Sequence, residues 1–224
     1  MLIIFDLDDT IIDTSGSIIP FRLEQALKHM VDAGLKVANY EQALQSLKAL
    51  DETAPSSKEA LKKFLQSHEA PSVCFDVGCH QIYACPDFKH PVEPTQNASD
   101  ALLSLHRKYK LAIVSVGIQE IQLEKMKKAG IDTSLFSSIL ICPDPFKKQF
   151  YLQLIEDFKI EPHRVIVVGD RIQRDLSPAK ELGCKTVHMK WGRGLHQKDE
   201  TQEIDFSIST LDQLRPIMTH LENL

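Results

Sequence analysis

The stretch IIFDLDDT, residues 3–10, places three carboxylates, Asp6, Asp8 and Asp9, within four positions directly after an apolar run. Like charges this close repel each other and raise each other's pKa, so a fold keeps them in open water or beside a positive charge. A solvated turn is one interpretation of the stretch, and a metal or phosphate site is the other. The apolar run, which begins at residue 2 as LIIF, predicts a strand buried on both faces.

Further apolar runs follow this strand and alternate with helical patterns over residues 97–109, 118–130 and 176–183. Continuous apolar runs separated by helices are typical of a parallel sheet, so we expect a doubly wound α/β fold. A shorter run over 204–209 predicts an edge strand, and residues 210–218 predict a last helix. The main runs are LAIV (111–114), SILI (138–141), VIVV (165–168) and KTVHM (185–189).

Residues 13–92 interrupt this alternation with helical patterns and no clear buried strand. Helices are expected over 20–34, with Pro20 near the start and Gly34 at the end, over 40–50 after Asn39 as N-cap, and over 56–68. Residues 71–85 fit either a helix or a strand, and a proline-rich passage follows. We therefore expect an α/β core of residues 1–12 and 93–224, with an α-helical domain of residues 13–92 inserted after the first strand.

The composition is that of an ordinary globular protein, with 43% hydrophobic and 25% charged residues in a chain of 224. A net charge of -5 is too acidic for a dedicated nucleic-acid binder. The run LIIF is too short for a signal peptide or a membrane span, and five cysteines fit reduced thiols better than a disulfide framework. We expect a cytoplasmic monomer or homodimer that binds neither nucleic acid nor membranes.

Polar residues follow three of the expected strands at the same edge of the sheet. Asp6 follows the first strand, Ser115 comes directly after LAIV, and Asp170 and Asp175 follow VIVV. Taken singly, Ser115 could cap a helix, Asp170 could belong to a turn, and Asp175 could be a helix N-terminal charge. Because ligands of parallel sheets bind outside the carboxyl ends of the strands, their convergence on one edge predicts a binding site.

The segments DLDDT, VSVG, a downstream lysine and GDRIQRD occur in this order. Together they resemble the four motifs of the haloacid dehalogenase-like hydrolase superfamily, over nearly all of the expected core. The helical insertion after the first motif resembles the superfamily's cap of the first type, and the stretch of residues 111–131 resembles its phosphatase branch. The resemblance implies a Rossmann-like core whose cap covers the crevice and selects the substrate.

The resemblance also implies roles for the first acidic segment. Asp6 would be the nucleophile that forms an aspartyl phosphate, and Asp8 would be the acid and base. Mg²⁺ would bind to Asp6, to the backbone carbonyl of Asp8 and to Asp170, with Asp175 holding it directly or through water. Residues 6 and 8 can project to the same side because side chains alternate along a strand, whereas Asp9 would point elsewhere and receives no chemical role.

The phosphate group would be bound by the Ser115 hydroxyl and by backbone N–H groups at the start of the following helix, with Val116 and Gly117 among the substrate-binding residues. A lysine would neutralise the phosphate and Asp6. Cys142 stands where the common K-P-D-P pattern has that lysine, so Lys147, which lies 23 residues before Asp170, is the first choice and Lys148 the second. The alternative is that both are solvated charges at the start of a helix.

These roles predict a Mg²⁺-dependent phosphatase that acts on a small phosphorylated metabolite. Asp8 favours phosphoryl transfer over dehalogenation, because attack on carbon needs no acid two residues after the nucleophile. A phosphomutase would use the same core residues, and a non-catalytic module that binds a phosphorylated ligand is a third possibility. Sugar phosphates, phosphoglycolate and nucleoside monophosphates all stay open as substrates.

Overall fold

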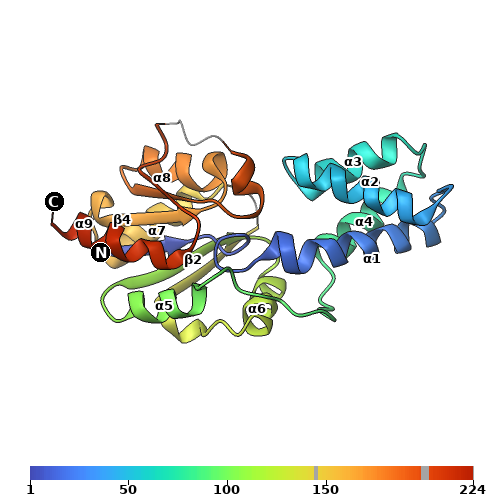
Figure 1. Ribbon diagram of the computed structural model, residues 1–224. Helices are drawn as coiled ribbons and strands as arrows, with labels where there is room; N and C mark the ends of the chain where they lie inside the picture. Colours follow the sequence, from blue (N-terminus) through green and yellow to red (C-terminus); the bar gives the residue numbers. More distant parts are fainter. Residues whose placement is uncertain (144–145, 198–201, 224) are drawn as a thin grey trace. The chain divides into compact units, whose positions relative to one another are not determined.

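The computed structural model describes residues 1–143, 146–197 and 202–223, and it contains a parallel sheet with helices on both faces (Figure 1). The strand order is β3-β2-β1-β4-β5-β6, and every neighbouring pair is parallel. The predicted doubly wound fold is confirmed. The strands are β1 (Leu2–Phe5), β2 (Lys110–Val116), β3 (Ser138–Cys142), β4 (Val165–Gly169), β5 (Lys185–Met189) and β6 (Phe206–Ile208).

The order of the strands locates the crevice where a ligand can bind. From β1 the chain adds β2 and β3 on one side, and then β4, β5 and β6 on the other side. The direction of winding therefore reverses at β1 and β4, which pair in register from Leu2↔Val165 to Phe5↔Val168. Open α/β sheets bind ligands outside the carboxyl ends of the strands at such a switch point. The residues that follow β1 and β4 are Asp6 and Asp170.

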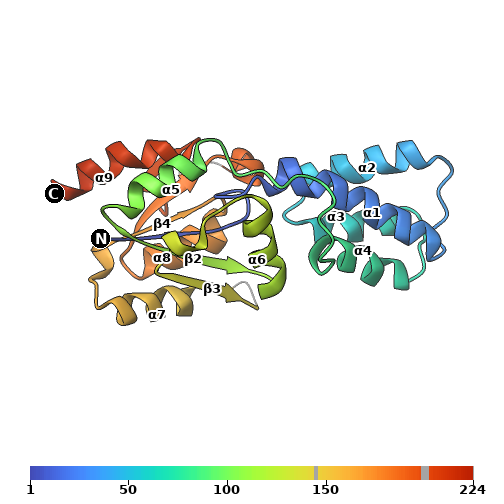
Figure 2. The same cartoon turned by 90° about the horizontal axis from the view of Figure 1, so that it is seen from below.

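Both faces of the sheet are covered, which explains the continuous apolar runs. Leu2 and Ile4 of β1 pack with side chains of α7 and α8, whereas Ile3 and Phe5 are buried against the opposite layer. Figure 2 shows α5 and α9 together on one side of the sheet and α7 on the other. The helices of this unit are α5 (Ala98–His106), α6 (Gln119–Lys128), α7 (Lys148–Phe158), α8 (Ser177–Glu181) and α9 (Leu214–Glu222).

Short helical turns complete the connections of the sheet. They differ from the predicted pattern at the C-terminal side, where the expected helix over 210–218 begins as a 3₁₀ turn before α9. The 3₁₀ turns are η2 (Thr133–Leu135), η3 (Pro162–Arg164), η5 (Gly192–His196) and η6 (Leu211–Gln213), and the π-helical turns are η1 (Thr14–Ile18) and η4 (Ile172–Leu176).

The inserted segment forms a compact helical unit of its own, Ser15–His90, while Met1–Thr14 and Pro91–Leu224 form the other unit. Asn39 caps its helix as predicted, because its Oδ1 accepts from the Gln42 N–H at 3.0 Å. The helices are α1 (Ile19–Asp32), α2 (Tyr40–Thr53), α3 (Ser57–Gln66) and α4 (Val73–Tyr83).

The helical unit has its own apolar core, built from the stripe on α1 that the sequence indicates. Leu23, Leu27 and Met30 of this stripe are buried with Leu47 and Phe64 from the neighbouring helices. The ambiguous segment over 71–85 is a helix, and Gly78 of α4 lets that helix approach α1, since a Cβ there would lie 3.0 Å from the Met30 sulfur. Among the described helices, none combines the length and the apolar character needed to cross a membrane.

Candidate active site

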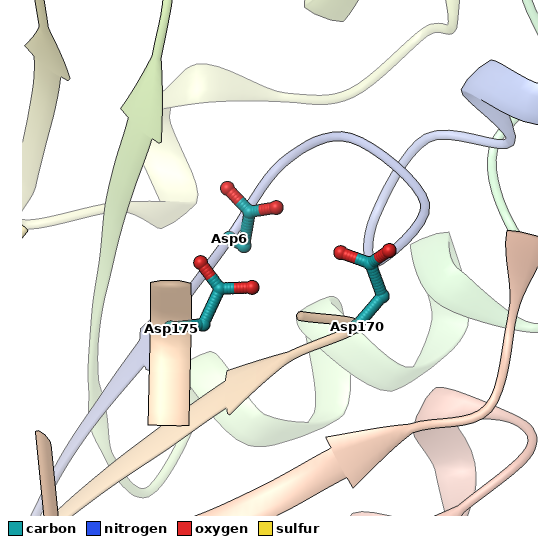
Figure 3. Close-up of side chains that lie close together, drawn as sticks. All are labelled: Asp6, Asp170 and Asp175. Carbon is teal, nitrogen blue, oxygen red and sulfur yellow. The ribbon is translucent and has the colours of Figure 1, made fainter. Parts of the chain in front are cut away.

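Three buried carboxylates meet at the carboxyl ends of β1 and β4. Asp6 follows β1, Asp170 follows β4, and Asp175 comes from the π-helical turn η4 (Figure 3). The backbone pairing of the two strands continues to Asp6, whose N–H donates to the Val168 carbonyl at 2.9 Å. One oxygen from each carboxylate lies within 4.8 Å of the others, and all three residues are buried. This acidic cluster is a set of oxygen donors of the kind that Mg²⁺ prefers.

Gly169, the last residue of β4, allows Asp175 to join the acidic cluster. A Cβ at this position would lie 2.6 Å from both the Cβ and the Oδ2 of Asp175, which is closer than real Cβ atoms come. The side chain of Asp175 is held there, because its Oδ2 accepts from the Arg171 N–H at 3.0 Å. The absence of a side chain at position 169 is therefore a requirement of the cluster.

The Gly169→Ala variant is expected to displace Asp175 and to weaken the binding of a divalent cation. Since both residues are buried, the added methyl group also destabilises the fold, by about 1–3 kcal/mol for an overpacked site. Urea unfolding and calorimetric titration with Mg²⁺ measure the two effects. If the free energy of unfolding and the Mg²⁺ affinity both stay unchanged, the close packing of Gly169 against Asp175 is contradicted.

Lys147 supplies the positive charge of the acidic cluster. Its Nζ lies 2.6 Å from Asp6 Oδ1 and 2.6 Å from Asp175 Oδ1, and only 3% of its side chain is exposed. Lys148 does not join the cluster, because its Nζ lies 2.6 Å from Glu181 Oε2 and half of its side chain is exposed. Successive residues at a helix start point about 100° apart, so one of the two lysines faces the sheet edge and the other faces solvent.

The electrostatics of the acidic cluster match a divalent cation. When all three carboxylates are ionised, they and the Lys147 ammonium leave two negative charges in a buried site. Burial, together with the charges of Asp175 and Asp8, raises the pKa of Asp6 to about 7 against the pull of Lys147. The pKa of Asp170 is raised well above its ordinary value by burial and by the charges of Asp175 and Asp6. Burial lowers the pKa of Lys147, but Asp175 and Asp6 outweigh this effect, so the net shift is upward.

The metal-free protein is expected to lose stability as the pH rises through the pKa of Asp6. The folded-state pKa of about 7 exceeds the ordinary value of 3.8, so the contribution of Asp6 is full below 3.8 and is lost as the pH passes 7. Mg²⁺ offsets the carboxylate charge, so it should raise the melting temperature at about pH 8 and hardly at about pH 5. Thermal unfolding with and without Mg²⁺ at both pH values measures this effect. Equal shifts of the melting temperature at the two pH values would contradict the raised pKa of Asp6.

Asp8 lies in a separate environment, in contact with three donors that the sequence pattern does not reveal. Its Oδ1 accepts from Thr14 Oγ1 at 2.5 Å and from Lys125 Nζ at 2.7 Å, and its Oδ2 accepts from Gln122 Nε2 at 2.9 Å. Burial raises the pKa of Asp8, but the charge of Lys125 and the three hydrogen bonds outweigh burial and leave it lowered. The carboxylate is therefore ionised and oriented.

The predicted phosphate-binding segment has only part of the expected geometry. Ser115 lies inside β2 rather than after it, and its Oγ is 2.9 Å from Gln122 Nε2. The Val116 carbonyl accepts from the same Nε2 at 3.0 Å. The Gly117 N–H donates to the Cys142 carbonyl at 2.9 Å, which extends the pairing of β2 with β3. The Gly117 amide is thus engaged within the sheet, and its role in binding phosphate stays a prediction.

Gln197 and Asp9 are two further residues at this edge with structural roles. Gln197 donates from Nε2 to the Asp170 carbonyl at 2.9 Å, and its Oε1 accepts from the Ile172 N–H at 2.9 Å, so its amide spans the loop that carries Asp170. Asp9, to which the sequence assigns no chemistry, is buried in a left-handed turn with φ 55°, with its carboxylate against Gly192. Neither side chain belongs to the acidic cluster.

The three hydrogen-bond donors to Asp8 could hardly be recognised from the sequence. Gln122 and Lys125 belong to IQEIQLEKMKK, in which most residues are polar, so no pattern distinguishes the two that face the sheet edge. Their spacing of three residues, which puts them on one face of α6, is the available hint. Thr14 lies just after the DLDDT segment, where the sequence does not distinguish it from an ordinary turn residue.

Comparisons with known proteins agree with this geometry. Residues 3–189 match the model of the haloacid dehalogenase-like hydrolase family. The glyceraldehyde 3-phosphate phosphatase of Methanocaldococcus jannaschii is 25% identical over 98% of this chain and 97% of its own.

Two solved structures share the fold over nearly the whole chain. A predicted phosphoglycolate phosphatase from Haemophilus somnus has a TM-score of 0.71 at 23% identity and covers 97% of both chains. A hydrolase of the same superfamily from Bacillus subtilis, solved with magnesium bound, has a TM-score of 0.66 at 18% identity and also covers 97% of both. With the family match spanning most of the sequence and the four motif segments at one sheet edge, the chain belongs to the haloacid dehalogenase-like hydrolases.

Proposed function

We propose that this protein is a Mg²⁺-dependent phosphatase that hydrolyses a small phosphomonoester through an aspartyl phosphate on Asp6. The observation that carries the proposal is the contact of Asp6 with the buried Lys147 inside the acidic cluster of Asp6, Asp170 and Asp175. A buried carboxylate paired with a buried ammonium, beside two further carboxylates, suits a nucleophile for an anionic substrate. Phosphatase activity agrees with the name of the relative from Methanocaldococcus jannaschii.

Phosphorylation of Asp6 is the first half of the proposed reaction. A carboxylate oxygen of Asp6 attacks phosphorus, the bond between phosphorus and the ester oxygen breaks, and the leaving oxygen takes a proton from Asp8. Lys147 offsets the repulsion between Asp6 and the phosphate. The incoming phosphate places negative charge beside Asp8, which favours its protonated form and so prepares it as the acid.

Hydrolysis of the aspartyl phosphate is the second half. Asp8 is now a carboxylate, and it accepts a proton from the attacking water while the bond between phosphorus and the Asp6 oxygen breaks. The Ser115 hydroxyl, which can accept from Gln122 Nε2 and still donate its own hydrogen, is suited to a phosphate oxygen. Inorganic phosphate and the free alcohol are the products.

Asp6, Asp170, Asp175 and the backbone carbonyl of Asp8 are the proposed Mg²⁺ ligands. Their fit rests on oxygen as the ligand atom, on the burial of the three side chains, and on the two negative charges that the cluster carries when its carboxylates are ionised beside Lys147. When bound, the cation supplies charge neutralisation and orientation to the phosphoryl group. The helical unit Ser15–His90 is proposed as the cap that selects the substrate, and the cytoplasm as the compartment.

A phosphatase screen over phosphorylated metabolites tests the proposed function. Glyceraldehyde 3-phosphate is the first compound to assay, beside phosphoglycolate, sugar phosphates and nucleoside monophosphates. We expect Mg²⁺-dependent release of inorganic phosphate, and loss of that release when EDTA removes the cation. Transfer of the phosphoryl group to another hydroxyl without phosphate release would identify a phosphomutase instead. Tight binding of a phosphorylated compound without turnover would identify a binding module.

A further inference from the structure

Two residues of α6 reach the carboxylate of Asp8 from one face of the helix. Gln122 donates from Nε2 to Asp8 Oδ2 at 2.9 Å, and Lys125 donates from Nζ to Asp8 Oδ1 at 2.7 Å. Each oxygen of Asp8 thus has its own donor on α6, and Thr14 adds a third hydrogen bond on Oδ1. A carboxylate held at both oxygens by groups on one helix has a single orientation. Gln122 and Lys125 themselves lie outside the four motif segments.

Gln122 is locked in place, and its amide can face only one way. The residue is 2% exposed, and its Nε2 lies within hydrogen-bonding distance of Asp8 Oδ2, the Val116 carbonyl and Ser115 Oγ. The first two partners are acceptors only, so the nitrogen rather than the oxygen of the amide must face them. Gly117 packs against the same amide, since a Cβ there would lie 3.4 Å from Gln122 Cδ. The amide therefore connects Asp8 to the end of β2.

Lys125 holds the Asp8 carboxylate with a positive charge and is more exposed than Gln122. Its side chain is 13% exposed and that of Asp8 is 31% exposed, so the ion pair borders solvent, whereas Gln122 is buried. A charge-assisted hydrogen bond at this distance is stronger than a neutral one. Among the described residues, neither Gln122 nor Lys125 contacts the acidic cluster of Asp6, Asp170 and Asp175. Neither is therefore placed to orient the nucleophile or to help bind the cation.

We propose that Gln122 and Lys125 are positioning residues that hold the Asp8 carboxylate in line with the phosphoryl group. They act through Asp8 and do not contact the substrate themselves. The inference rests on the proposed function, because it assigns Asp8 the acid and base role. Proton transfer depends steeply on the placement of the donor, and a misplacement of 1 Å can cost about 10²-fold in rate.

A double-mutant cycle with Asp8 tests this proposal. The single variants are Gln122→Met, which keeps the length of the side chain and removes the donors, and Lys125→Met. We expect kcat for an alkyl phosphomonoester to fall roughly 10- to 100-fold in each, with KM changed less than about twofold. In the Asp8→Asn background the same substitutions should cause no further loss. A further loss of similar size in that background would overturn the proposal, because the residue would then act on the substrate directly.

Two variants serve as controls, one for the loss of a positive charge on α6 and one for the loss of the charged donor at position 125. Lys128→Met removes an exposed charge from the same helix and should leave kcat unchanged. Lys125→Arg keeps a charged donor and should restore most of the rate that Lys125→Met loses. Failure of the arginine to restore any rate would contradict a hydrogen-bonding role. If Gln122→Met does not fold, the variants of Lys125, which is more exposed than Gln122, still give a complete cycle.

A pre-steady-state measurement with p-nitrophenyl phosphate separates this inference from the proposed function. Its leaving group needs no protonation, so the variants should form the aspartyl phosphate at the wild-type rate and then hydrolyse it slowly. The expected result is a burst of one p-nitrophenolate per protein followed by slow turnover. Absence of a phosphorylated protein in every variant and in the wild type would refute the proposed function. Formation and hydrolysis at wild-type rates in both variants would refute the positioning role alone.

Discussion

The Asp6→Asn variant is expected to lose phosphatase activity by roughly 10⁴-fold or more, the scale on which removal of a covalent nucleophile acts. Asparagine keeps the shape of the side chain but cannot form an acyl phosphate. The measurement is phosphate release in the presence of Mg²⁺, together with mass spectrometry of the protein after acid quenching. The wild type should carry one additional phosphoryl group, and the variant should carry none.

The same substitution should stabilise the metal-free protein at neutral pH. The raised pKa of Asp6 means that the fold disfavours its charge, and asparagine removes that charge. Loss of activity with equal or higher melting temperature therefore separates the chemical role from a folding defect. Asp157→Asn, at an exposed position of α7, is the control and should change neither quantity. Phosphate release that continues unchanged in Asp6→Asn would remove Asp6 as the nucleophile.

The Lys147→Met variant is expected to lose activity by about 10²- to 10³-fold, the range for removal of a group that stabilises transition-state charge. The reason is that the Nζ lies between Asp6 and Asp175, where it offsets the charge of the nucleophile. Steady-state kinetics should show the loss mainly in kcat, and phosphoenzyme formation should slow with it. Lys148→Met is the matched comparison, because its exposed partner Glu181 lies away from the acidic cluster.

The free energy of unfolding should differ between the Lys147→Met and Lys148→Met variants as clearly as the activity does. Removal of Lys147 leaves buried carboxylates without a counter-charge, a change that costs about 3–5 kcal/mol for buried ion pairs. Removal of Lys148 breaks an exposed pair worth at most about 1 kcal/mol. Urea unfolding without Mg²⁺ measures both, and added Mg²⁺ should recover part of the loss in Lys147→Met. Equal losses in the two variants would contradict the assignment of Lys147.

The strands and the positions of the acidic residues could be inferred from local pattern. LIIF and VIVV are continuous apolar runs because both faces of a parallel sheet are buried, and the residues that follow them must then share one edge. Asp6 and Asp170 are therefore expected to lie close together from the sequence alone. The sequence also predicts the helical insertion, because the spacing of Leu23, Leu27 and Met30 is that of a helix with one apolar face.

Contacts that depend on how a helix is rotated against the sheet could not be inferred in this way. Lys147 and Lys148 are adjacent and chemically identical, and the placement of α7 determines which one faces Asp6. Asp8 meets Gln122 and Lys125 across more than a hundred residues of chain, on a helix that is polar on several sides. Local sequence specifies which elements form, because burial sets their periodicity, whereas the partners of each polar side chain follow from the packing of the elements against one another.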